Sequence, residues 1–580
     1  MSRQGKTEYN LNGKGVMLFL LFLAILASLK SIFFDCEIDV EYAVAMSYRM
    51  LQGDNMLQQM WEPHQTSAFL GTLLMKPFVA VTGTTTGIVV YLNACGVLLH
   101  GVVVWIFYSF LKKRVDINTA GLMSIFFLAA RPKDIVFPEF SNMQLWFSVL
   151  FFISLLCYFE KQEQKYRLLL SSVFLCLEII SYPSCVIVWL PVMVLLWMYS
   201  ETKWKDILLF TGACAVQGCV YAGYFIVRTG GIAAFLKTLE NIVSGDASHQ
   251  AGANGMGFFF CENLLVSVVW LAGSLLVAFL VNKFWVSRLC KLCNRSNQQR
   301  TKEQQKGSFF MLAGVIGLLG LAIQVVAKSS RMAHVSLYLV VIILALFAAK
   351  GCEAQERRMV YVGMTISISS CVATALLTNL DISATLMYLI LAVMVAFIPL
   401  KGYRQQEMLL WGKTVRYDLI IIFCLLCLFQ RGVYVKLLGG YSSPLEIGGI
   451  VKAGPELGIF ADYMGANIRN VTLSEWDTFV QDGDNVLIVE KEGTSTIGYL
   501  YNDTGVSAPS TICTPTFDEQ LLEYWELYPE KYPDVVAVQC WYGEPLLEED
   551  SWMMQWLNNE FRAESIEDGT YWRFYRGNIY

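Results

Sequence analysis

The sequence is poor in charge. Only 16% of its 580 residues are Asp, Glu, Lys or Arg, whereas soluble globular chains carry about 25%. Hydrophobic residues make up 55% of the chain. This balance excludes an ordinary soluble domain and indicates a polytopic membrane protein.

Several common motifs are missing as well. The chain has neither GxGxxG nor a P-loop, so no nucleotide site is indicated. Its cysteines are scattered, and Cys290-x-x-Cys293 has no second pair nearby, which argues against a metal or redox cluster. The basic segment 282–306 lacks interleaved stacking aromatics, so we expect it to meet anionic lipid headgroups and no nucleic acid.

Long apolar runs are what the chain has instead. A membrane span needs about 20 apolar residues, and thirteen candidates are present, which predicts a polytopic α-helical fold. They lie near residues 16–34, 87–111, 117–130, 143–159, 168–181, 184–199, 207–227, 258–282, 308–327, 335–349, 359–378, 384–400 and 417–438. The run 69–81 is too short and is interrupted by Lys76 and Pro77, which favours a re-entrant or interfacial helix.

The loops between the spans differ in charge. With a cytoplasmic N-terminus, the inner loops hold 25 Lys and Arg residues and the short outer loops hold 7. Because basic residues are enriched in cytoplasmic loops, this bias predicts a cytoplasmic N-terminus. Thirteen spans then place the C-terminus outside the membrane.

The composition changes after residue 438. Residues 439–580 contain 24 acidic and 7 basic residues. Short apolar runs at 486–489 and 535–538 predict buried strands, and 474–480 and 517–527 predict helices. The chain therefore divides into a membrane domain, residues 1–438, and an extracytoplasmic α/β domain, residues 439–580.

An acidic loop, residues 35–68, follows the first span. Its first four acids, Asp35, Glu37, Asp39 and Glu41, stand within seven positions. Burying one carboxylate in the bilayer costs roughly 2.5–3.5 kcal/mol, so these groups belong to a solvated helix end or to a catalytic loop. From Glu41 onward apolar residues recur at helical spacing until Gly53-Asp54, which predicts a helix along the outer membrane surface.

Other polar groups lie in the outer segments. Glu62 and His64 flank Pro63 in a tight turn, where neither has an evident structural task. The amphipathic pattern at 232–243 predicts a helix in a long outer loop, which is a lid or a plain linker. Further outer candidates are Arg131, Lys133, Glu139, Arg331 and His334.

Chemistry outside the membrane has no supply of ATP or nucleotide sugars, so a substrate carried in the membrane, such as a polyprenyl-phosphate sugar, fits best. Glycosyl transfer from it needs a carboxylate base for the acceptor hydroxyl. It also needs cations or a metal for the leaving phosphate and a groove for the lipid. The acids and cations of the outer loops supply the first two requirements.

The acidic loop resembles that of the GT-C class of membrane glycosyltransferases, especially the aminoarabinose-transferase-like and protein O-mannosyltransferase-like groups. The matching residues are Asp39, Glu41-Tyr42, Ala43, Ala45, Met50-Leu51, Gly53-Asp54 and Trp61-Glu62-Pro63. The stretch Phe137-Pro138-Glu139 to Asn142 is similar to the second outer loop of the class, whose usual acid falls near Asn142. This chain departs from the Asp-Glu pattern of the class by spacing its acids as Asp-x-Glu-x-Asp-x-Glu.

The resemblance implies a polyprenyl-phosphate sugar donor and a glycan, lipid or protein acceptor. It implies Asp39 as the base, with Asp35 as the alternative and Glu62 as a second acid. A divalent metal between Asp35 and Asp39, with His64 as a further ligand, is compatible with the pattern. The expected substrate-binding residues are Glu37, Glu41, His64, Arg131, Lys133, Glu139, Arg331 and His334.

Two other functions remain open. A transporter or flippase for lipid-linked saccharides would also need many spans, but such proteins often show paired halves, and no internal repeat is evident here. A non-catalytic scaffold or sensor with an outer binding domain is the third possibility.

Overall fold

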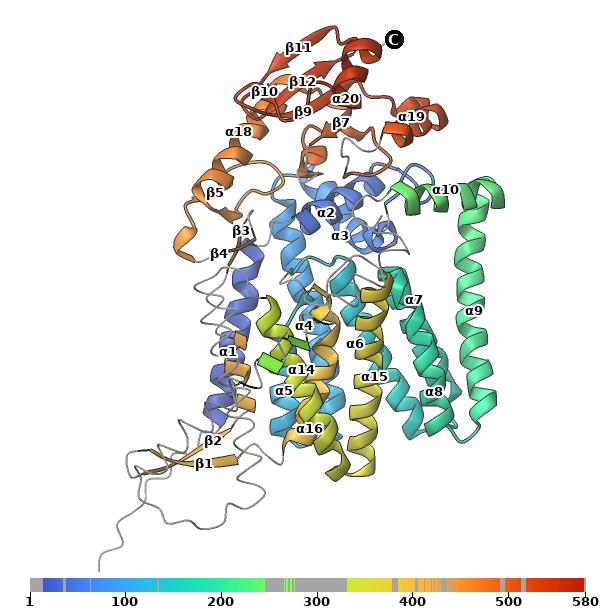
Figure 1. The fold of residues 1–580 in the computed structure, drawn as a ribbon, viewed down its shortest axis with the longest axis vertical. Helices are drawn as coiled ribbons and strands as arrows, with labels where there is room; N and C mark the ends of the chain where they lie inside the picture. The colour runs from blue at the N-terminus through green and yellow to red at the C-terminus, as the bar shows by residue number, and fades with distance from the viewer. Residues whose placement is uncertain are drawn as a thin grey trace, which may run out of the picture.

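A computed structural model describes residues 14–34, 38–62, 64–132, 135–245, 331–377, 384–401, 444–490, 496–512 and 518–577, with short pieces at 265–276 and 405–442. The described part has a helical bundle at one end and an α/β domain at the other (Figure 1). Helices α2 (Ile38–Leu51), α3 (Ala68–Thr82) and α10 (Ile232–Gly245) lie between them.

The bundle follows the predicted apolar runs. It contains α1 (Lys14–Lys30), α4 (Ile88–Leu111), α5 (Ile117–Ala129), α6 (Phe140–Glu160), α7 (Lys165–Ser181), α8 (Trp189–Tyr199), α9 (Lys203–Arg228), α14 (Arg331–Ala348), α15 (Ala354–Leu377) and α16 (Ile390–Leu400). Polar residues cap the N-termini of two of these helices. Asp116 accepts a hydrogen bond from Thr119 N at the start of α5, and Glu139 accepts from Ser141 N and Asn142 N at the start of α6.

Not every predicted span has the length of a membrane helix. Among the described residues, four helices are long and apolar enough to cross a bilayer: Gly15–Phe33, Ile88–Leu111, Phe140–Glu160 and Lys203–Arg228. The predicted spans 258–282 and 308–327 lie outside the described residues, apart from isolated helical positions in the first. The count of thirteen therefore stays a prediction.

The last predicted span is wrong at its C-terminal end. The described pieces at 420–428 are helical, but β3 (Val435–Leu437) pairs antiparallel with β4 (Gly440–Ser442). Before that span, β1 (Gln405–Leu410) and β2 (Lys413–Asp418) form a hairpin. Apolar composition predicted one continuous helix here because composition over a whole run does not show where a helix ends and a strand begins.

The outer domain is built on a mixed sheet in the order β11-β12-β9-β7-β8. Its predicted strands are confirmed as β7 (Asn485–Val489) and β9 (Val535–Trp541), which pair in parallel. The remaining strands are β8 (Gly505–Val506), β10 (Glu544–Pro545), β11 (Ser565–Asp568) and β12 (Trp572–Arg576). Helix α18 (Tyr463–Phe479) packs on the sheet through Trp476, whose ring meets Trp572 and Phe574 edge-on.

Smaller elements complete the outer domain. Short pieces β5 (Gly449–Ile450) and β6 (Phe460–Ala461) precede α18, and α19 (Asp518–Leu527) and α20 (Trp552–Trp556) follow it. The predicted helix 517–527 is thus confirmed as α19, and the predicted helix 474–480 is the end of the longer α18.

The short helix predicted at 69–81 is confirmed as α3, with Pro77 inside it and Gly83 closing it at φ 68°. The helix predicted from Glu41 is confirmed as α2, and its place along the outer membrane surface stays a prediction. Every residue from Val40 to Arg49 is buried. The helix packs between α3 and the turn η10 (Thr496–Leu500) of the C-terminal domain, so protein and not water covers most of its surface.

Candidate active site at the outer end of the first helix

One hydrophobic cluster joins the acidic loop to the outer domain. Tyr42, Met46 and Trp61 belong to the same buried cluster as Ile497 and Tyr499. The backbone adds hydrogen bonds across this boundary, from Trp61 N to Pro509 O and from Gly87 N to Gly454 O. The loop that was expected to lie on the membrane is therefore part of the base of the outer domain.

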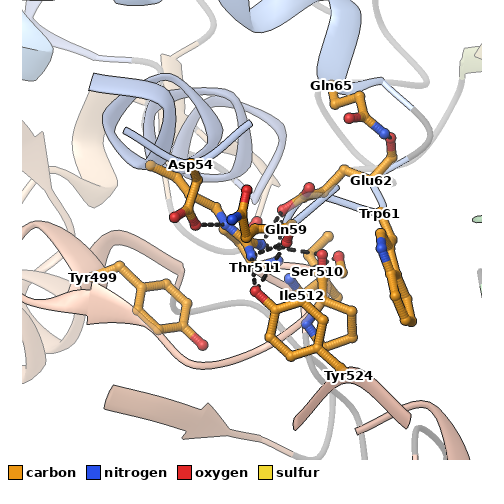
Figure 2. Close-up of polar contacts among 12 residues, drawn as sticks. Asp54, Gln59, Trp61, Glu62, Gln65, Tyr499, Ser510, Thr511, Ile512 and Tyr524 are labelled. Carbon is orange, nitrogen blue, oxygen red and sulfur yellow. Dashed lines mark hydrogen bonds and ion pairs between the residues drawn. The ribbon is translucent and has the colours of Figure 1, made fainter. Parts of the chain in front are cut away.

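Arg49 lies at the centre of this boundary and is fully buried. Its guanidinium pairs with Asp54 at 2.5 Å and with Glu62 at 3.2 Å. It also donates to the carbonyl oxygens of Gln59 and Pro509, and to the Tyr524 hydroxyl at 2.8 Å. Figure 2 shows Asp54, Gln59, Glu62 and Tyr524 gathered in this region. Three of the five contacts lie within the acidic loop, and those with Pro509 and Tyr524 join the loop to two segments of the outer domain.

Glu62 therefore has a structural task that the sequence did not reveal. Its carboxylate is fully buried, and Oε1 accepts hydrogen bonds from Arg49 and from Thr511 N at 3.0 Å. Burial raises the pKa of Glu62, although the charge of Arg49 opposes this. This position corrects the expectation of a second acid that faces the acceptor.

Glu41 is held in a second ion-pair cluster. Arg469 on α18 binds Glu41 through Nη2 at 2.6 Å and Glu456 through Nε at 2.6 Å, and all three side chains are buried. One cation thus serves two carboxylates. Burial raises the pKa of Glu41 to about 8, and the nearby Glu456 and Glu490 add to this, while Arg469 lowers it. Glu41 links two domains, in contrast to its expected role in substrate binding.

This cluster makes a pH-dependent contribution to stability. The folded chain keeps the Glu41 proton up to about pH 8, whereas an unfolded chain loses it near its ordinary pKa. Between these values the folded state binds the extra proton, so the stabilisation is complete at low pH and is lost as pH rises towards 8. We expect Glu41→Gln to match the wild type in apparent Tm at pH 5 and to exceed it above pH 8.

The measurement is a series of thermal unfolding scans of the purified full chain at several pH values. Asp477→Asn, which removes one exposed acid from the same helix, α18, is the matched control and should leave the pH profile unchanged. A Glu41→Gln profile parallel to that of the wild type would contradict the assignment.

Asp39 differs from these acids. It lies in the first turn of α2, just beyond the outer end of α1, and is half-exposed. Glu41, Asp54 and Glu62 all bind Arg or Lys in the buried clusters, with Lys531 reaching Asp54 at 2.5 Å. Asp39 is thus the described acid of this loop that keeps access to solvent. Asp35 and Glu37 lie outside the described residues.

His64 lies at the outer ends of α6 and α7. Its ring is nearly buried and stacks on Phe140 with centroids 4.1 Å apart, with Tyr182 at 5.1 Å. Among the described residues no group of three or more His, Cys, Asp or Glu side chains could hold a metal. The predicted metal site includes Asp35, which lies outside the described residues, so it stays a prediction and we derive no step through a metal.

The remaining candidates are spread over the outer loops. Arg131 is buried beside the bundle. Glu139 is the buried N-cap of α6, where its carboxylate accepts from backbone amides, which corrects its expected role in substrate binding. Lys133 lies outside the described residues, as do the side chains of Arg331 and His334 on α14.

A buried polar cluster at the outer ends of the bundle helices was only partly anticipated. Glu178 on α7 is fully buried and accepts hydrogen bonds from Gln144 Nε2 at 2.8 Å and from Ser370 Oγ at 3.1 Å. Glu178 stands in an apolar run of the sequence, and the structure places its carboxylate inside the protein. The sequence did not single out Gln144 or Ser370, because polar residues lie close to each of them in the chain.

Comparisons with known proteins found similarity in structure alone. No family model matches the sequence, and no curated protein matches it. The structure is similar to the archaeal oligosaccharyltransferase AglB of Archaeoglobus fulgidus, solved with an inhibitory peptide and a dolichol-phosphate. The identity is 10%, the TM-score 0.42, and the match covers 90% of this chain and 69% of that one.

Two further structures of the same oligosaccharyltransferase give similar values. One is tethered to an acceptor peptide containing the NVT sequon, with 11% identity, a TM-score of 0.37 and coverage of 91% and 70%. Another is a complex with Zn and sulfate, with 13% identity, a TM-score of 0.37 and coverage of 90% and 68%. These proteins belong to the GT-C class, the class that the acidic loop resembles. TM-scores this low do not assign a function to the chain, so its function is argued from the residues of the site.

Proposed function

We propose that this chain is a membrane glycosyltransferase that transfers a sugar from a polyprenyl-phosphate-linked donor to an acceptor hydroxyl outside the membrane. The observation that supports the proposal is the position of Asp39. It lies in the first turn of α2, just beyond the end of α1, and it is half-exposed, whereas Glu41 and Glu62 are buried. In this proposal Asp39 lies at the membrane surface, at the level of the lipid phosphate, where a carboxylate can act as a general base.

In the proposed reaction Asp39 takes the proton of the acceptor hydroxyl, and the oxygen bonds to the anomeric carbon of the donor sugar. The bond between that carbon and the phosphate oxygen breaks, and the lipid phosphate leaves with the electron pair. Arg131, Lys133, Arg331 and His334 are the proposed cations for the leaving phosphate. In this proposal residues 1–438 hold the lipid and residues 439–580 form the outer domain that supports α2.

The sugar and the acceptor can be identified directly. Membrane vesicles that contain the full chain are incubated with a panel of labelled polyprenyl-phosphate sugars, and the label that leaves the lipid is measured. We expect one class of sugar to be released, faster than from vesicles without the protein. Transfer from none of the lipids, with labelled lipid crossing the bilayer instead, would overturn the proposal and favour a transporter.

A further inference from the structure

The outer domain contains a groove. Strands β9 to β12, whose connecting turns form part of its lining, lie at the end of the molecule opposite the bundle (Figure 1). The groove runs between α18 and two hairpin turns, one joining β9 to β10 and the other joining β11 to β12, and its volume is about 920 Å³. The side chains that matter for its chemistry are Asn470, Ser474, Thr478, Tyr542, Glu544 and Asp568.

The lining is suited to hydroxyl groups and not to anions. Amide and hydroxyl groups can both donate to and accept from sugar hydroxyls, and carboxylates accept from them. None of the described residues that line the groove is Lys or Arg. Tyr542 adds a flat aromatic ring that is 71% exposed. An exposed ring beside converging polar groups is the combination that can bind a pyranose, which has an apolar face and a polar rim.

The backbone of Tyr542 has a strained conformation, and this strain does not stabilise the domain. Trp541 pairs with Glu544, so Tyr542 and Gly543 form a two-residue hairpin turn with φ values of 51° and 83°. Such turns prefer Asn-Gly, and a bulky residue in this left-handed region is an outlier. Strain of this kind gathers at functional sites.

The groove is also rigid before any ligand arrives. Tyr542 N donates to Thr570 O at 2.7 Å, and Arg573 donates to Gly543 O at 2.8 Å, so the two turns are joined. Below them the nearly buried carboxylate of Glu475 accepts hydrogen bonds from the amides of Thr570 and Tyr571. These contacts fix the exposed Tyr542 ring against Trp541, with centroids 5.4 Å apart.

We propose that this groove binds a neutral oligosaccharide, with one sugar ring stacked on Tyr542 and its hydroxyls bonded to Asn470, Ser474 and Asp568. The site is separate from Asp39, and it holds a glycan without reacting with it. The proposal does not depend on the glycosyl transfer proposed above.

The test uses the full chain in lipid nanodiscs, because sugar-headed detergents would compete. Cellohexaose, maltohexaose and mannohexaose are titrated in turn, with hexalysine as a cationic probe, and binding is measured by calorimetry. Tyr542→Asn should weaken hexaose binding by about tenfold or more, the value of one lost aromatic contact. The Asn-Gly turn should keep or raise the apparent Tm, so loss of binding cannot be loss of folding.

Two further variants test whether binding depends on the aromatic ring at position 542. Tyr542→Phe keeps the ring and should retain binding. Tyr463→Ala removes a ring that is 77% exposed on the same domain but outside the groove, and should have no effect. The proposal is overturned if no hexaose binds at millimolar concentration, if only hexalysine binds, or if Tyr542→Asn binds as the wild type does.

Discussion

Replacing Asp39 with Asn should reduce sugar transfer by about 10²- to 10⁴-fold, the usual contribution of a general base. The amide has nearly the same shape as the carboxylate but cannot take the proton of the acceptor hydroxyl. Asp39 is half-exposed in the first turn of α2, so the apparent Tm should remain close to that of the wild type. Release of labelled sugar from the lipid donor and thermal unfolding are measured on the same preparation.

Asp482→Asn is the matched control, since Asp482 is an exposed acid in a turn of the outer domain. It should leave both transfer and Tm unchanged. If Asp39→Asn transfers sugar at the wild-type rate, Asp39 is not the base, and Asp35 becomes the next residue to test. A loss of transfer together with a large fall in Tm would indicate a structural role instead.

Replacing Arg49 with Met should be the most destabilising single change in the region between the membrane helices and the outer domain. Met fills much of the space but leaves Glu62 fully buried without its cation, and removes one of the two cations bound to Asp54. Breaking a buried ion pair by removing one partner costs about 3–5 kcal/mol. We expect a fall in apparent Tm of roughly 10 °C, together with faster hydrogen exchange in α2 and α19.

A second substitution distinguishes charge from packing. Arg49→Met combined with Glu62→Gln no longer buries the unpaired Glu62 charge and should recover part of the lost stability. Arg562→Met, which makes the same change at an exposed residue of the outer domain, should shift Tm little. If Arg49→Met is as stable as this control, the Arg49 contacts do not hold the outer domain to the acidic loop.

Much of the fold could be predicted because local signals are strong in this chain. Long apolar runs gave the positions of α4, α6 and α9, and apolar runs bounded by turns gave β7 and β9. The signal failed at residues 417–438, where a short apolar run is shared between helical pieces and β3. Runs of that length do not carry a clear period.

The candidate site was predicted less completely than the fold. The acidic loop was found, but its acids could not be ranked from the sequence, because several of the groups that bind them lie far along the chain. Arg469 reaches Glu41 from 428 positions away, and the Thr511 amide reaches Glu62 from 449 positions away. Arg49 gave a weak local signal, as the lone cation of a helix that also holds two acids in its first turn.

The sequence by itself determined the class of protein, the positions of most helices, the acidic outer domain and the loop in which the carboxylates gather. These follow from composition and from periodicity over a few turns, both of which are local properties. Only the tertiary structure decided which carboxylates are buried. A buried acid needs a partner cation, and here folding brings Arg49 from the end of α2 to Glu62 and Arg469 from the outer domain to Glu41, while Asp39 stays half-exposed.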